Sequence, residues 1–207
     1  MLFWILKAIF YIPVRILYPI SIIGKKNIPK SGGAIEICNH RRLMDIVVTV
    51  ANQMRKPRTL GKKELFKFFL FRWLLKALGG MPVDRQDVKA SSLKTVIRVL
   101  KKGKIVLIFP EGTRNKNPDG KLMELKQGTA LLALMARVPV IPMYLKKPPK
   151  LFRKNCLFIG EAVDLSNYYN KVPTPQILEE ANQALTDSML KLQEYSISYK
   201  NKYARIG

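Results

Sequence analysis

A histidine and an aspartate that could act together lie early in the chain, in the segment Asn-His-Arg-Arg-Leu-Met-Asp at residues 39–45. Histidine is the side chain best suited to general base catalysis near neutral pH, and it works best when a carboxylate holds its other ring nitrogen. Inside one helix, His40 and Asp45 would point ~140° apart. They can therefore meet only if His40 lies at a strand-to-helix turn and Asp45 reaches back from the first helical turn. For this spacing alone, a surface histidine near a helix-start aspartate is the simpler alternative.

A second segment with chemical potential is Phe-Pro-Glu-Gly-Thr-Arg at residues 109–114, at the end of a continuous apolar run. Gly112 lets the backbone approach a ligand closely, and the planar guanidinium of Arg114 suits a phosphate group. Glu111 can accept hydrogen bonds from sugar or glycerol hydroxyls. A surface β-turn is the alternative, because Pro-Glu-Gly would satisfy one without any ligand.

Two further segments are weaker by themselves. Residues 79–85 read Gly-Gly-Met-Pro-Val-Asp-Arg, and Arg85 could be a second phosphate ligand or could pair with other charges in a turn. Residues 138–142 read Val-Pro-Val-Ile-Pro, which indicates only a buried strand with prolines at its margins.

The charge of the chain limits the class of partner. In 207 residues there are 37 Lys and Arg against 14 Asp and Glu, a net charge of +23. A field of this sign favours an anionic partner: nucleic acid, anionic lipid or a phosphorylated substrate. One histidine and two cysteines, Cys38 and Cys156, exclude a disulfide framework and argue against a metal site built on His and Cys, so no metal is expected. A reducing, cytoplasmic setting is the natural interpretation.

The first 23 residues are strongly apolar, but one lysine, one arginine and two prolines interrupt them. Each uncharged run is shorter than the ~18 residues that a membrane span needs. We therefore expect two short helical pieces, residues 2–12 and 14–18, that lie in the membrane interface. Residues 1–23 would form this segment and residues 24–207 one α/β domain. A buried N-terminal helix is the alternative.

Helical and buried-strand patterns alternate through the rest of the chain, which predicts an α/β fold with a mostly parallel or mixed central sheet flanked by helices. Ligand sites in such folds lie at the ends of strands. The expected strands are residues 34–38, 58–61, 81–83, 104–109, 138–143 and 156–160. The expected helices are residues 41–54, 63–78, 87–102, 125–137 and 174–199.

Together and in this order, the four segments resemble the motifs of the lysophospholipid acyltransferase family, which includes 1-acylglycerol-3-phosphate acyltransferases. Its Asn-His-x4-Asp, Phe-Pro-Glu-Gly-Thr-Arg and Val-Pro-Val-Ile-Pro motifs are all present, as are the short segment that ends in Arg and a Lys-x-Gly at residues 126–128. The resemblance covers about residues 24–145. Arg41 and Arg42 depart from the family, which often has a small polar residue between His and Asp.

The resemblance implies transfer of a fatty acyl group from acyl-CoA or acyl-acyl carrier protein to the sn-2 hydroxyl of lysophosphatidic acid, a step of phospholipid biosynthesis, with no further cofactor. His40 would be the general base and Asp45 would orient it. The glycerol phosphate would be held by residues that the motifs match: Arg85, Glu111, Gly112, Thr113, Arg114 and Lys126.

Other functions remain open at this level. The acceptor could be glycerol-3-phosphate or another lysophospholipid. From a different class, a non-catalytic basic protein that binds membrane or nucleic acid would suit the charge, but it leaves the motifs unexplained, and no nucleic-acid motif is present. We therefore expect an anionic membrane surface as partner, no nucleic acid, and a peripheral or monotopic position on the cytoplasmic face of the cell membrane.

Overall fold

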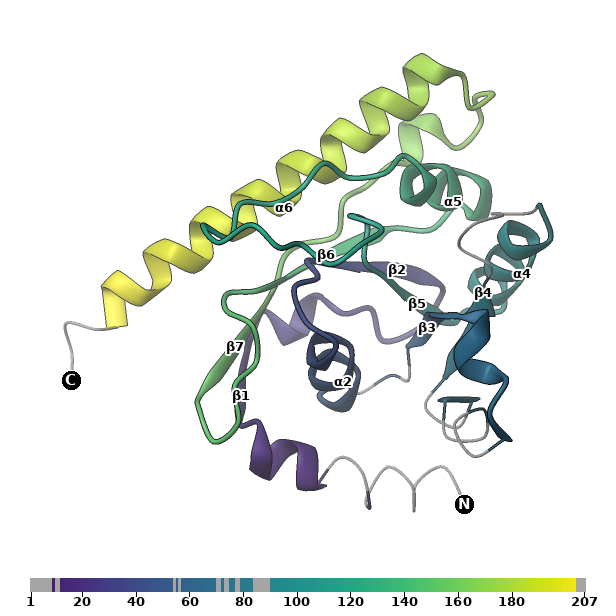
Figure 1. Cartoon of the computed structure of the whole chain (residues 1–207). Helices are drawn as coiled ribbons and strands as arrows, with labels where there is room; N and C mark the ends of the chain where they lie inside the picture. The colour runs from purple at the N-terminus through teal and green to yellow at the C-terminus, as the bar shows by residue number, and fades with distance from the viewer. Residues whose placement is uncertain are drawn as a thin grey trace.

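The computed structural model describes residues 9, 12–53, 55, 57–69, 72, 75–76, 79–83 and 90–203. Within this part of the chain, seven strands form one sheet in the order β1-β7-β6-β2-β5-β3-β4 (Figure 1). Every neighbouring pair is parallel except β6 and β7. The strands are β1 Ile20–Ile23, β2 Ala34–Cys38, β3 Arg58–Lys62, β4 Gly80–Val83, β5 Ile105–Ile108, β6 Val140–Leu145 and β7 Asn155–Ile159. The expected α/β fold with a mostly parallel or mixed sheet is confirmed.

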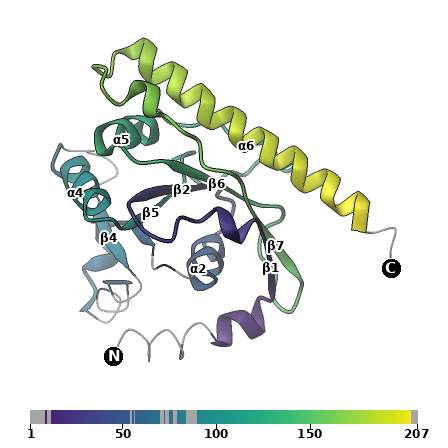
Figure 2. The ribbon, with the colours of Figure 1, turned by 180° about the vertical axis from the view of Figure 1, so that it is seen from behind.

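Helices cover both faces of the sheet (Figures 1 and 2). One core cluster joins the sheet to α4, α5 and α6, and a second joins its other face to α2. The helices that pack against the sheet are α2 Met44–Ala51, α4 Ala90–Lys101, α5 Gly128–Ala136 and α6 Pro175–Tyr203. Short 3-10 turns are η1 Lys25–Asn27, η2 Lys63–Phe66 and η3 Ser166–Tyr168.

Strand β2 lies at the centre of both clusters. Its side chains alternate between the faces, so Ile35 and Ile37 pack toward α4–α6 while Ala34 and Cys38 pack toward α2. All of them are fully buried. This explains why the strand reads as a nearly continuous apolar run, interrupted only by Glu36.

The N-terminal segment differs from the expectation at its end. Residues 20–23, which we placed in the interface segment, form strand β1 and pair in parallel with β7. Residues 12–17 are helical, and Ile12 and Ile16 are more than half exposed. Most of the piece expected at residues 2–12 lies outside the described residues. In the part of the chain that the structure describes, no helix has both the length and the apolar character needed to cross a membrane.

The prediction of a helix from residue 63 was wrong at its start, because the chain there forms η2 and then a bend. The cause is tertiary packing of Phe66, which is buried. A Cβ on Gly61 would lie 2.8 Å from the Phe66 ring, and one on Gly80 would lie 3.2 Å from it. The ring therefore fills the space that these two glycines leave on β3 and β4, and this contact overrides the local helix preference.

Candidate active site

The end of β2 presents His40 to Asp45. The side chain of Asn39 ties this end to β6, because its Nδ2 donates to the carbonyl of Leu145 at 3.0 Å and its Oδ1 accepts the Leu145 N–H at 2.7 Å. His40 follows directly, and its Nδ1 lies 3.1 Å from Oδ2 of Asp45. Asp45 is the second residue of α2, so the pair meets across a strand-to-helix turn, the only geometry that its spacing allows. Both side chains are buried.

Backbone donors hold the Asp45 carboxylate in place. Its Oδ2 accepts the N–H groups of Arg41 and Arg42, each at 2.6 Å. These contacts explain why α2 begins at Met44 and not at residue 41, as we had expected, because residues 41–43 form the turn that wraps the carboxylate. In the tautomer whose Nδ1–H donates to Asp45, Nε2 is the unprotonated nitrogen and can act as the base.

Glu111 contacts the backbone of His40. It is 2% exposed; its Oε1 accepts the His40 N–H at 2.8 Å and its Oε2 accepts the Met123 N–H at 3.4 Å. Burial raises the pKa of Glu111, and the hydrogen bond from the His40 N–H opposes that rise. The next contact comes from Asn115, whose N–H donates to the His40 carbonyl at 2.6 Å. The loop after β5 therefore holds both backbone groups of His40.

The same loop exposes groups that could bind a ligand. Gly112 has a φ of 71° and an added Cβ would lie 2.7 Å from Cε of Lys126, so the two residues touch. The Lys126 N–H donates to the carbonyl of Pro110 at 2.9 Å, and α5 accordingly begins only at Gly128, later than residue 125. Gly112, Thr113, Arg114 and Lys126 are all exposed.

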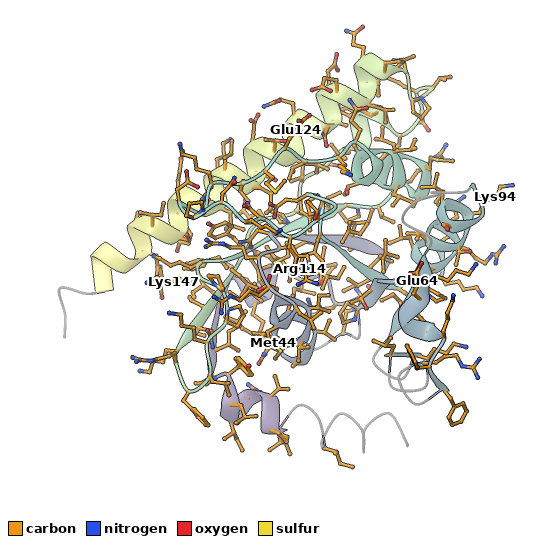
Figure 3. The ribbon with its side chains drawn as sticks, in the orientation of Figure 1. Met44, Glu64, Lys94, Arg114, Glu124 and Lys147 are labelled. Carbon is orange, nitrogen blue, oxygen red and sulfur yellow. The ribbon has the colours of Figure 1, made fainter. Side chains whose placement is uncertain are left out.

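Arg114, labelled in Figure 3, immediately precedes Asn115, and the Asn115 N–H donates to the His40 carbonyl, so the backbone of Arg114 lies next to the site. With Lys126 it places two cations within one loop system beside the His40–Asp45 pair, an arrangement suited to an anion such as a phosphate. Arg85, the other predicted phosphate ligand, lies outside the described residues.

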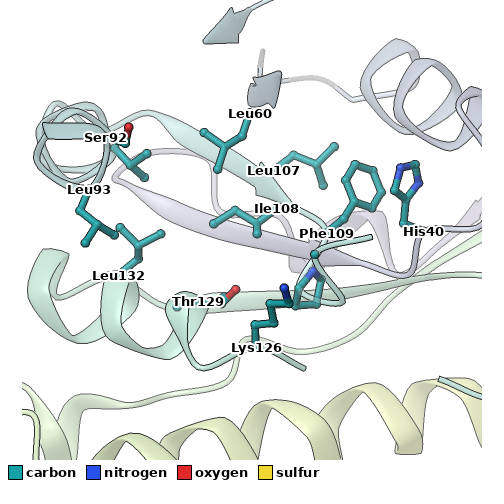
Figure 4. Close-up of a pocket in the computed structure, with 14 residues that line it drawn as sticks. His40, Leu60, Ser92, Leu93, Leu107, Ile108, Phe109, Lys126, Thr129 and Leu132 are labelled. Carbon is teal, nitrogen blue, oxygen red and sulfur yellow. The ribbon is translucent and has the colours of Figure 1, made fainter. Parts of the chain in front are cut away.

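An apolar cavity of about 240 Å³ extends from His40 (Figure 4). His40 lies at one end, where its ring centroid is 4.2 Å from that of Phe109, and Leu93 lies at the other. Most of its lining side chains are apolar: Leu60, Leu93, Val96, Leu107, Ile108, Phe109 and Leu132. The shape and lining suit an alkyl chain whose reactive end meets the imidazole.

Sequence reasoning missed these lining residues, because apolar residues at helical and strand spacing predict only a core. It also assigned no role to Asn39, which lies inside the first motif, or to Asn115, which directly follows Arg114. Among the described residues, no group of three or more His, Cys, Asp or Glu side chains could hold a metal ion.

Comparisons with known proteins agree with this geometry. A family model described as Acyltransferase matches residues 19–146. A 1-acyl-sn-glycerol-3-phosphate acyltransferase of Bacillus subtilis is 31% identical over 84% of this chain and 88% of its own. One from Cocos nucifera is 35% identical over 78% of this chain, which spans only 52% of that relative. The crystal structure of the 1-acyl-sn-glycerophosphate acyltransferase PlsC from Thermotoga maritima superposes with a TM-score of 0.70 at 25% identity, over 94% of this chain and 79% of that one.

Proposed function

The chain belongs to the acyltransferase family, and from that premise we propose that it transfers a fatty acyl group from an acyl thioester to the sn-2 hydroxyl of 1-acylglycerol-3-phosphate, which yields phosphatidic acid. A relative named 1-acyl-sn-glycerol-3-phosphate acyltransferase and the solved structure of the acyltransferase PlsC support the assignment over most of the chain. The structural observation that carries it is the His40–Asp45 contact at one end of an apolar cavity. A base beside a slot for an alkyl chain provides the two elements that acyl transfer to a lipid hydroxyl needs.

In this mechanism Nε2 of His40 takes the proton of the acceptor hydroxyl as its oxygen attacks the thioester carbonyl. The tetrahedral intermediate then collapses, the carbon–sulfur bond breaks, and the leaving thiolate takes the proton from the imidazolium. Asp45 stabilises that imidazolium and holds the ring through Nδ1. General base catalysis of this kind contributes ~10²–10⁴-fold.

Arg114 and Lys126 would bind the phosphate of the acceptor, and Gly112 and Thr113 would let the backbone approach it. Arg85 completes the proposed set from its position in the motif. For Glu111 the hydrogen bonds favour a different role from the substrate contact first expected. Because its two oxygens accept backbone N–H groups, we assign it to positioning His40.

The donor is acyl-CoA or acyl-acyl carrier protein, and no further cofactor takes part. The net charge of +23 supports an anionic membrane surface as partner and a peripheral or monotopic position on the cytoplasmic face of the cell membrane. The exposed Ile12 and Ile16 of the helical residues 12–17 support contact of the N-terminal segment with lipid.

The test is acceptor-dependent release of free thiol from palmitoyl-CoA, or from palmitoyl-acyl carrier protein, with 1-oleoylglycerol-3-phosphate in detergent micelles. His40→Ala is expected to abolish turnover, and Arg114→Ala is expected to raise the KM for the acceptor. Lys104→Ala, which removes an exposed cation just before β5 and far from His40 along that strand, is the matched control and should behave as wild type. Folded protein that is silent with both donors and every lysolipid would refute the proposed function.

A further inference from the structure

The loop between β6 and β7, residues 146–154, was left unexplained by the motifs. It reads Lys-Lys-Pro-Pro-Lys-Leu-Phe-Arg-Lys, with five cations and no carboxylate. Leu151 is 51% exposed and Phe152 is 72% exposed, so two large apolar side chains face solvent between cations. This combination is typical of segments that bind membrane surfaces, where apolar side chains enter the headgroup region and cations bind lipid phosphates.

The loop is held rigidly in this form. Asn155 is buried and its Nδ2 lies within 3.3 Å of the carbonyls of Pro19, Lys150 and Arg153, while its Oδ1 accepts the Lys150 N–H. The Phe152 N–H donates to the carbonyl of Leu17 at 2.7 Å. These contacts fix the loop to the end of the N-terminal helical residues.

Phe152 has a φ of 53°, in the left-handed region that bulky residues rarely adopt. An aromatic side chain there costs backbone strain, and because it is exposed it gains little packing in return. A glycine or asparagine would fit the backbone better. The strained, exposed aromatic therefore indicates a function outside the folded core.

The pairing of the strands places the loop at the edge of the sheet that carries His40. Strand β6 is parallel to β2, so the loop after β6 and His40 after β2 leave from the same edge. Strand β1 is parallel to β7, which is antiparallel to β6, so residues 12–17 before β1 also lie at that edge.

A third exposed apolar pair lies at the same edge. Phe68 and Phe69 follow β3, which is parallel to β5, and they are 71% and 76% exposed. The guanidinium carbon of Arg72 lies 5.9 Å from the centroid of the Phe69 ring, so this pair too has a cation beside it. Figures 1 and 2 show all three segments toward the lower end of the molecule. Three separate apolar points at one end fit a broad, flat partner, which is the shape of a bilayer and not of a peptide in a groove.

We propose that the β6–β7 loop is a membrane-binding loop, which inserts Leu151 and Phe152 among lipid headgroups and binds anionic lipid phosphates through its exposed cations, Lys147, Lys150, Arg153 and Lys154 (Figure 3 labels Lys147). This inference rests on the proposed function in that the acceptor is a bilayer lipid. It adds a contact that is separate from residues 1–23, and it turns the edge that carries His40 toward the membrane.

The first test is flotation of the full chain with vesicles of equal parts phosphatidylglycerol and phosphatidylcholine. We expect Leu151→Ser/Phe152→Asn to weaken partitioning about tenfold or more. Lys150→Gln/Arg153→Gln/Lys154→Gln should weaken it similarly, but only when anionic lipid is present, because pure phosphatidylcholine offers no net surface charge.

Matched controls remove similar side chains from the opposite edge of the sheet. Val172→Ser deletes an apolar side chain that is 77% exposed in the segment between β7 and α6. Lys101→Gln/Lys102→Gln/Lys104→Gln deletes three exposed cations that precede β5. Both controls should partition as wild type. Equal losses in the loop variants and the controls would overturn the proposal, as would wild-type partitioning of the loop variants.

Turnover in detergent micelles separates this inference from the proposed function. The loop variants should keep it, because their loop contacts neither His40 nor the cavity. If the wild type binds vesicles through the loop but has no turnover with any acceptor, the proposed function is refuted and the membrane-binding role of the loop is still supported. If the cation variant instead loses binding to acyl carrier protein while vesicle partitioning is unchanged, the loop is a carrier-protein site and the membrane proposal is overturned.

A second measurement reports the position of the loop directly. With Trp4→Phe and Trp73→Phe removing both tryptophans, Phe152→Trp places the only indole at the loop tip. Its emission should shift to shorter wavelength when vesicles are added, because the indole moves into a less polar environment. The same protein with Val172→Trp in place of Phe152→Trp should show no shift. An unshifted indole at position 152 would overturn the proposal.

Discussion

Two buried acidic sites, one at the middle of β2 and one just beyond its end, differ in how their carboxyl groups are hydrogen-bonded. At the middle of β2, Glu36 is fully buried and its Oε2 accepts one hydrogen bond from Gln53 at 2.6 Å, while its Oε1 has no partner among the described residues. Just beyond its end, Oδ2 of Asp45 accepts three donors and Glu111 accepts two backbone N–H groups. Glu36 thus has one hydrogen-bond donor, whereas Asp45 has three and Glu111 has two, although Oδ1 of Asp45, like Oε1 of Glu36, has no partner among the described residues.

We expect the Glu36 site to affect the stability of the fold, and the acids near His40 to affect activity. Burial raises the pKa of Glu36 from its ordinary value of 4.5 to about 8, so this carboxyl is mostly neutral at pH 7 and cannot act as a fixed charge. Backbone N–H groups orient the two carboxyl groups near His40, and the hydrogen bond from the His40 N–H opposes the rise in pKa that burial causes at Glu111. A buried acid that destabilises the fold when it ionises, Glu36, thus lies only four residues before His40, which we assign to catalysis.

The largest effect should come from Asp45→Asn. Without the negative charge, the imidazolium that forms at His40 loses its stabilising partner. The imidazole ring is also no longer held in the tautomer that leaves Nε2 unprotonated, so kcat should fall about 10³–10⁴-fold. The measurement is thiol release at saturating substrates, with urea unfolding to show that the variant is folded. Asp187→Asn, on the exposed face of α6, is the control and should keep wild-type turnover. A folded Asp45→Asn enzyme with near wild-type kcat would remove Asp45 from the catalytic cluster.

Glu36→Gln tests the Glu36 site through its effect on the free energy of unfolding. Between pH 4.5 and about 8 the folded protein holds a proton on Glu36 that the unfolded chain releases, so stability falls as pH rises through this window. The amide introduced by Glu36→Gln has no such proton, yet its carbonyl can still accept from Gln53.

The gain in unfolding free energy of Glu36→Gln over wild type should therefore grow by roughly 3 to 4 kcal/mol from pH 5 to pH 8. Urea unfolding at several pH values measures it, and exposed Glu161→Gln should show no such growth. Turnover at neutral pH should stay within about twofold of wild type, since Glu36 does not line the cavity. A pH-independent difference would show that Glu36 is ionised in the folded state.

Glu111→Gln should reduce kcat about tenfold to a hundredfold with little change in the KM for the acceptor. An amide can accept from only one of the two backbone N–H groups, and its NH₂ opposes the other, so His40 loses its position while the phosphate ligands remain. Glu124→Gln, an exposed glutamate in the same loop, is the control. A raised KM with unchanged kcat would instead assign Glu111 to substrate binding.

Gly112→Ala should have the smallest effect and extends the comparison to Lys126. Gly112 has a φ of 71°, so an alanine there should lower the free energy of unfolding by about 1 kcal/mol, and its Cβ must displace the Lys126 side chain. We expect that loss of stability and a severalfold higher KM for the acceptor. Gly32→Ala has a φ of 77° but meets nothing within 4 Å, so it isolates the backbone strain and should leave KM unchanged. Equal KM values for the two variants would separate Lys126 from the phosphate site.

Much of the fold was predictable because its signals are local. The strand at residues 34–38 matches β2 in full, since a mostly apolar run is typical of a buried parallel strand, even with Glu36 in its middle. The last helix was expected to start at residue 174, and there the Oγ1 of Thr174 accepts the Ile177 N–H at 3.3 Å. Strand β1 was not predicted, because its apolar residues continue an apolar N-terminal segment and only pairing with β7 distinguishes them.

For the candidate site, the sequence by itself determined which residue types stand at which strand ends, and the spacing of His40 and Asp45 already required a turn between them. Only the tertiary structure decided that Glu111, 71 residues away, bonds the His40 backbone, and that an apolar cavity begins at the imidazole. It alone also gathered three exposed apolar segments at one edge of the sheet. The physical reason is that periodicity and turn chemistry act over a few residues, whereas partners across the sheet are chosen by how strands pair and pack.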